Sequence, residues 1–123
     1  MSWNYQQSTG ILRDRRGVVA GVGYSGCGAG RNAPCAQTMF GLGPIPRGLW
    51  DIVGPPEDNA SHGPYVLRLE PYIDNKTFDR EGFVIAGDDS GQPEAPMGNR
   101  LVLPLVVRKD IWESGDHTLE VVA

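Results

Sequence analysis

Apolar and polar residues alternate in short runs along most of the chain, and glycine or proline separates one run from the next. Such alternation is typical of β-strands that bury one face. Strands are predicted at residues 3–7, 11–12, 18–22, 48–53, 65–69, 83–85 and 118–122. The second and third of these flank a basic turn and predict a β-hairpin. The glycine-rich residues 23–44 are expected to be irregular.

One segment, Pro104 to Trp112, predicts a helix. Proline suits the first turn of a helix, because its missing N–H group would have no partner there in any case. Leu105, Val106 or the stem of Arg108, and Trp112 can share a face of this helix, which we expect to pack inward. One helix among about seven strands predicts a mainly β fold.

The composition supports a globular protein and narrows its function. The 123 residues suit one domain, so residues 1–123 are treated as a single domain. No apolar run approaches the roughly 18 residues that cross a bilayer. The polar N-terminus MSWNYQQSTG has neither the basic nor the apolar region of a secretion signal. A net charge of −4 does not favour a nucleic-acid partner.

The two cysteines, Cys27 and Cys35, lie eight positions apart in a glycine-rich segment. This is not the spacing of a zinc site, and the two histidines, His62 and His117, are distant in sequence, so no metal is predicted. The cysteines could be two thiols in a loop, or a disulfide formed in an oxidising compartment. The sequence leaves both interpretations open, because it does not supply the geometry that a disulfide needs.

Several motifs, in one order from Trp3 to Val122, resemble a known family. They are Trp3-x-Tyr5 with Gln7-Ser8-Thr9-Gly10, Gly23-Tyr24-Ser25-Gly26, Gly43-Pro44-Ile45-Pro46-x-Gly48, Gly63-Pro64, Phe83-x-Ile85-x-Gly87-Asp88, and Val102-Leu103-Pro104 with Ile111-Trp112-x-Ser114-Gly115-Asp116. Together they resemble the L,D-transpeptidase-like effector family of the type VI secretion system. The resemblance implies a β-sandwich or barrel and a peptidoglycan-directed transpeptidase or carboxypeptidase.

The resemblance also implies where such a protein acts. Family members are made in the bacterial cytoplasm without a signal peptide and delivered into the periplasm of a rival cell, where they cut or exchange bonds in peptidoglycan stem peptides. The implied partners are these stem peptides, an immunity protein and components of the secretion apparatus. Neither a cofactor, a nucleic acid nor a membrane is implied.

The sequence departs from the family at the reacting positions. Family chemistry is acyl transfer by a cysteine thiolate with an adjacent histidine. The histidine position is Ala86 here, and the cysteine position is Arg100, or Asn99 if the alignment shifts by one residue. None of the three can act as a thiolate or move a proton in the family's way. The expectation is therefore a catalytically degenerate protein that acts by binding.

The candidate binding residues are Tyr24, Arg47, Asp88, Asn99 and Arg100. The guanidinium groups of Arg47 and Arg100 suit stem-peptide carboxylates, although both could equally be surface charges. Asp88 with Asp89 could form a carboxylate pair for hydrolysis, or Asp88 could bond backbone N–H groups in a turn.

Two other functions stay open from the sequence. Cys27 or Cys35 could form a new dyad with His62 or His117, which would give an active stem-peptide hydrolase with a relocated nucleophile. Alternatively, the chain could be a structural or adaptor protein that keeps the fold alone. A muropeptide digest would identify the hydrolase, and a pull-down on sacculi would separate a binding protein from an adaptor.

Overall fold

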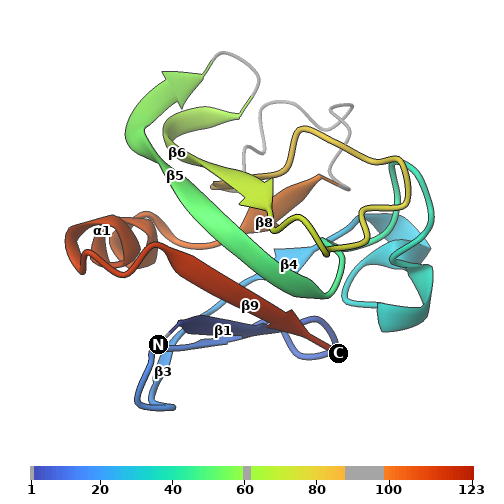
Figure 1. The fold of residues 1–123 in the computed structure, drawn as a ribbon, viewed down its shortest axis with the longest axis horizontal. Coiled ribbons are helices and arrows are strands. Elements are labelled where there is room, and N and C mark those ends of the chain that lie inside the picture. Colours follow the sequence, from blue (N-terminus) through green and yellow to red (C-terminus); the bar gives the residue numbers. More distant parts are fainter. Residues whose placement is uncertain (1, 60–61, 88–98) are drawn as a thin grey trace.

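The computed structural model describes residues 2–59, 62–87 and 99–123. These residues form a mainly β fold with one α-helix, as the sequence predicts (Figure 1). The strands are β1 (Trp3–Gln6), β2 (Ile11–Arg13), β3 (Val19–Val22), β4 (Tyr24–Ser25), β5 (Gly48–Asn59), β6 (Gly63–Pro71), β7 (Val84–Ala86), β8 (Arg100–Val102) and β9 (Thr118–Val122). The helix α1 spans Leu105–Glu113, and two 3₁₀ turns lie at Gly28–Gly30 and Pro34–Ala36.

The strands form one sheet in the order β3-β2-β1-β9-β5-β6-β7-β8-β4, which curves into a nearly closed barrel. Only Gly23 separates the two edge strands β3 and β4 in the sequence. Its N–H donates to the Gly10 carbonyl at 2.8 Å. A Cβ on Gly23 would lie 1.8 Å from the carbonyl oxygen of Val102, so only glycine lets the chain pass from one edge to the other here.

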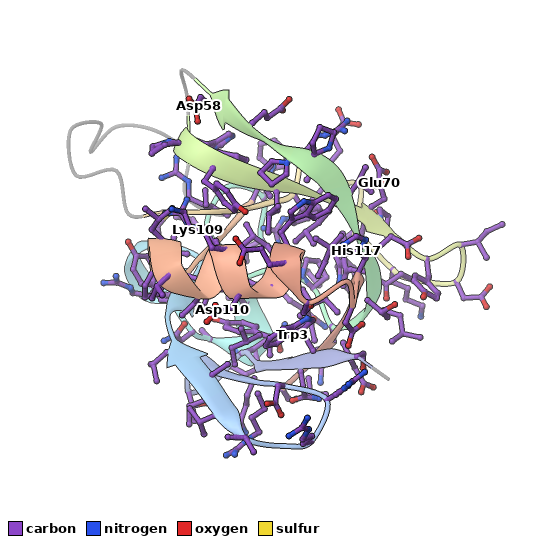
Figure 2. All side chains as sticks on the ribbon, turned by 90° about the vertical axis from the view of Figure 1, so that its left-hand side faces the viewer. Trp3, Asp58, Glu70, Lys109, Asp110 and His117 are labelled. Carbon is purple, nitrogen blue, oxygen red and sulfur yellow. The ribbon has the colours of Figure 1, made fainter. Side chains whose placement is uncertain are left out.

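The main apolar core fills the inside of this barrel. Trp50 is fully buried; its indole N–H donates to Pro46, and its ring meets Phe83 edge-on at 4.9 Å between centroids. Figure 2 shows α1 lying between the β5–β6 hairpin and the N-terminal strands, with Lys109 and Asp110 labelled on it. In the described part of the chain, no helix is long and apolar enough to span a bilayer.

The inward face of α1 agrees with the prediction at Arg108 and Trp112 and differs from it at Leu105 and Val106. Leu105 and Val106 are 42% and 65% exposed, whereas Val107, Arg108 and Ile111 are buried. Positions i, i+1 and i+4 lie on one side of a helix, so this set forms the stripe that meets the sheet. An arginine therefore takes a place in that stripe that its charge alone does not predict.

Most predicted strands are confirmed, and the differences have local causes. β9 has the predicted bounds, and β2 pairs with β3 as the predicted hairpin. β5 continues past Val53 to Asn59, because shifts in its register with β6 accommodate Pro55 and Pro56. The very short strands β4 and β8 were not predicted; they pair with each other, and β8 also pairs with β7.

Candidate functional site

The two positions where the resemblance expects a histidine and a cysteine lie on neighbouring strands. β7 and β8 are parallel, with Val84 opposite Arg100 and Ala86 opposite Val102. Because side chains alternate along a strand, Ala86 and Arg100 lie on the same face of the sheet. Ala86 is fully buried and packs in a small apolar cluster with Val66 and Val84. The two positions therefore lie on one face of the sheet, and neither position carries a thiol or an imidazole.

Arg100 is fully buried, and its guanidinium contacts two other segments. Nη1 donates to the Gly87 carbonyl at 3.3 Å, and Nη2 lies 3.1 Å from Nδ1 of His62. A guanidinium can only donate, so Nδ1 accepts and the proton of the neutral imidazole sits on Nε2. Burial, and secondly the positive charge of Arg100, lower the pKa of His62. We infer that His62 is neutral at pH 7.

Arg108 approaches the same glycine from α1. It is only 4% exposed. Its Nε donates to Leu103 at 3.0 Å, and its Nη1 donates to the carbonyls of Pro64 at 2.7 Å and Tyr65 at 3.0 Å. A Cβ on Gly87 would lie 2.7 Å from Nη2 of Arg108, so glycine at position 87 lets the guanidinium approach the backbone closely. Burial lowers the pKa of Arg108, but arginine begins so high that the group stays charged at neutral pH.

A cavity of about 490 Å³ opens beside these groups. Its walls come from the β3–β4 junction, the start of β6, the ends of β7 and β8, and the first turn of α1. The polar side chains of the described lining are Tyr24, His62 and Arg108, and the rest are apolar residues, glycine and proline. This volume suits a small ligand. The described lining offers hydrogen-bond donors, but no thiol, carboxylate or aliphatic hydroxyl group.

His62 also lines a second cavity of about 840 Å³, which runs along β6 and the segment before β7. Acidic and basic side chains are mixed in this lining, among them Glu57, Glu70, Arg68 and Arg80. Such a mixture favours neither sign of ligand charge. We therefore place the candidate site in the first cavity, where the charged side chain of the described lining is a guanidinium.

The structure brings two of the five predicted binding residues to this cavity or its border. Tyr24 pairs with Val102 across β4 and β8 and lines the cavity, and the guanidinium of Arg31 lies 3.6 Å from the centre of its ring. Arg100 reaches the border through its contacts with His62 and Gly87, although it is not itself a lining residue.

The other three predicted binding residues are placed differently. Asn99 stabilises a loop, since its Nδ2 donates to the Glu81 carbonyl and its Oδ1 accepts from Arg80. Arg47 is exposed, bonds Gln37 through its backbone N–H and its Nε, and does not line the cavity. Asp88, like its neighbour Asp89, lies outside the described residues.

Cys27 and Cys35 are free thiols, so no disulfide joins them in the structure. Cys27 donates from its Sγ to the Gly41 carbonyl at 3.3 Å, and Cys35 is exposed. Neither cysteine lines the 490 Å³ cavity. His117 stacks on Trp112 with 4.2 Å between ring centroids. The described contacts therefore give the relocated-dyad hypothesis no support.

Arg108 and Gly87 build the site but were not among the predicted binding residues. For Arg108 a signal was present, because it stands between Val107 and Ile111 at the spacing of an inward-facing stripe. His62 was considered only as half of a dyad. Its contact with Arg100 joins two positions that are 38 apart in the sequence, which no local pattern indicates.

No family model, curated protein or solved structure matches this chain significantly. The geometry of the site and the sequence motifs therefore provide the support for a function.

Proposed function

We propose that this protein binds peptidoglycan stem peptides without cleaving them, as a catalytically degenerate protein of the L,D-transpeptidase-like effector type. One observation carries the proposal. Where the motif resemblance expects the nucleophilic cysteine, the chain has a fully buried arginine, and its guanidinium is held by Gly87 and His62. The link to peptidoglycan is supported by the motifs alone.

The described groups at this site are poorly suited to acyl transfer. The guanidinium of Arg100 stays protonated and has no lone pair to attack a carbonyl. Ala86 cannot carry a proton. His62 is the imidazole beside the site, but its Nδ1 accepts from Arg100, and the nearby positive charge opposes its protonation. Losing the nucleophile removes the covalent route altogether.

The cavity nevertheless suits a short peptide. Apolar walls such as Val22 and Leu103 can cover aliphatic parts of a ligand, and Arg108 can donate to its oxygens. Stem peptides carry free carboxylates, which guanidinium groups bind well. By the same resemblance, we propose delivery through type VI secretion into the periplasm of a target cell, with an immunity protein as a further partner.

Sedimentation with purified sacculi, combined with a muropeptide digest, tests this proposal. We expect the protein to sediment with sacculi and to leave tetrapeptide-stem muropeptides unchanged. Release or exchange of a stem residue by the unmodified protein would overturn the degenerate assignment. A folded protein that remains in the supernatant would instead contradict binding and favour the adaptor function.

A matched pair of variants makes the sedimentation specific to the cavity. Arg108→Gln removes a positive charge from the cavity wall, and Arg15→Gln removes the same charge from an exposed turn. We expect sedimentation to fall for Arg108→Gln and to stay unchanged for Arg15→Gln. Equal losses for both variants would indicate adhesion by net charge and not binding in the cavity.

A further inference from the structure

We propose that Arg108 and the first turn of α1, where they line the cavity near Gly87, form a subsite for a carboxylate group. This deepens the proposed function, because stem peptides carry such groups, and it rests on that function only for the identity of the natural ligand. The subsite itself is argued from the contacts of Arg108.

One terminal nitrogen of the Arg108 guanidinium has no acceptor among the described residues. Nε and Nη1 of Arg108 donate to three backbone carbonyls, and among the described residues Nη2 has no acceptor. The side chain is 96% buried, and both Arg108 and Gly87 line the cavity. Nη2 itself is not fully buried, so it can donate to an oxygen of a ligand bound in the cavity.

No acidic group among the described residues balances the positive charge of Arg108. The three acceptors of Arg108 are neutral carbonyls, and no described residue forms an ion pair with it. The described lining of the cavity contains neither Asp nor Glu. A buried cation favours an anion that can pair with it, so the cavity favours a negatively charged ligand.

The first turn of α1 borders the same cavity. Pro104 and Leu105 line the cavity, and no side chain of the described residues caps the N-terminus of the helix. The N–H groups of a first turn have no acceptor within the helix, and the helix dipole favours negative charge at this end. Arg108 lies one turn further along and donates its own N–H to Pro104. The helix end and the guanidinium therefore border one cavity.

The walls indicate a carboxylate on an organic body. Val22, Val102, Leu103 and Leu105 give the cavity an apolar lining of about 490 Å³ in volume. A small inorganic anion would leave this lining in contact with water. A carboxylate on a short aliphatic or peptide body would cover it while its two oxygens meet the guanidinium.

An NMR titration with three probes tests the subsite. N-acetyl-D-alanine should shift the side-chain signals of Arg108 and the amide signal of Leu105 in a saturable way, and its carboxamide should not. Arg108→Gln should weaken binding of the acid by roughly 10- to 100-fold, and Arg15→Gln should leave it unchanged. An equal response to the carboxamide, or to inorganic phosphate, would overturn the assignment to an organic carboxylate.

Gly87→Ala provides a second variant, because Arg108 also bonds three carbonyls and its loss affects the fold. The added Cβ would lie 2.7 Å from Nη2 and 3.3 Å from Cζ, so it keeps the arginine but forces its guanidinium away from its present place at the cavity wall. We expect the same loss of acid binding with little change in the thermal midpoint. A Gly87→Ala protein that binds the acid as tightly as the unmodified chain would overturn the subsite.

The two proposals can fail separately. Acid binding without binding to sacculi would overturn the proposed function and leave the carboxylate subsite in place. Sacculus binding by a protein that ignores the acid would overturn the subsite and leave the proposed function in place.

Discussion

Arg80 and Arg108 are both buried, and both donate to three backbone carbonyls, but they serve different regions of the molecule. Arg80 bonds the carbonyls of Gln37 and Pro44 through Nη1 and that of Gly43 through Nη2. Its guanidinium also lies 5.2 Å from the ring centre of Phe83. It thereby connects the loop before β5 to the segment that enters β7.

The two arginines differ in what their terminal nitrogens, Nη1 and Nη2, contact. Both terminal nitrogens of Arg80 bond carbonyls of the protein, whereas Arg108 leaves Nη2 beside Gly87 at the wall of a cavity. Burial and the number of carbonyl partners therefore do not separate a structural arginine from a binding arginine. What separates them is whether each terminal nitrogen faces a carbonyl of the protein or a cavity. Substitutions at both arginines test this distinction.

The largest effect is expected for Arg80→Leu. This change removes three charge-assisted hydrogen bonds and leaves three carbonyls without their donor, so the free energy of unfolding should fall by about 3–5 kcal/mol. Urea denaturation measures the loss. Binding of N-acetyl-D-alanine, measured where the variant is still folded, should stay unchanged. A loss below about 1 kcal/mol would contradict the structural role of Arg80.

The second largest effect compares two glycines, one from each region. A Cβ on Gly43 would lie 1.9 Å from the Ala36 carbonyl oxygen, which belongs to the backbone, whereas a Cβ on Gly87 would lie 2.7 Å from Nη2 of Arg108, the end of a side chain that can shift more easily than backbone. We expect Gly43→Ala to cost about 2–4 kcal/mol and Gly87→Ala less than about 1 kcal/mol. Thermal unfolding of both variants checks this. Equal losses in the free energy of unfolding would show that glycine at position 87 serves the fold and not a ligand.

The same two regions show what the sequence could predict of the fold. Alternation over residues 118–122 predicted β9 with its observed bounds, because half-buried strands impose a period of two. β8 was missed because three residues are too few to show a period, and the strand exists through pairing with β4 and β7. The end of β5 was missed because Pro55 and Pro56 usually end a strand, and here a shifted register retains them.

The site was less predictable than the fold. Tyr24 and Arg100 were recognised from motifs. Arg108 was assigned to its helix, but its role requires the carbonyls of Pro64 and Tyr65, which lie 44 and 43 positions away in sequence. Such contacts follow from the tertiary fold and leave no local pattern. A charged residue within an apolar stripe is the sequence signal that deserves more weight.

The smallest effect concerns Arg100, the third buried arginine, and its contact with His62. The folded-state pKa of His62 is lowered, first by burial and then by Arg100, so the unfolded chain binds this proton more tightly. The contribution of His62 to stability is therefore fully present above its unfolded pKa of about 6.5, and it is lost as the pH falls from there through the folded pKa.

Two substitutions isolate this effect. His62→Gln keeps an acceptor for Arg100 but does not titrate, so its free energy of unfolding should fall less than that of the unmodified chain between about pH 7.5 and pH 5. Arg100→Met should raise the pKa of His62 only part of the way to its ordinary value, because burial, the larger cause, remains. Histidine ring signals followed by NMR measure this pKa directly. If Arg100→Met left the pKa of His62 unchanged, Arg100 would not act on this imidazole in solution. Arg100 would then not be the residue that keeps His62 from serving as a general base.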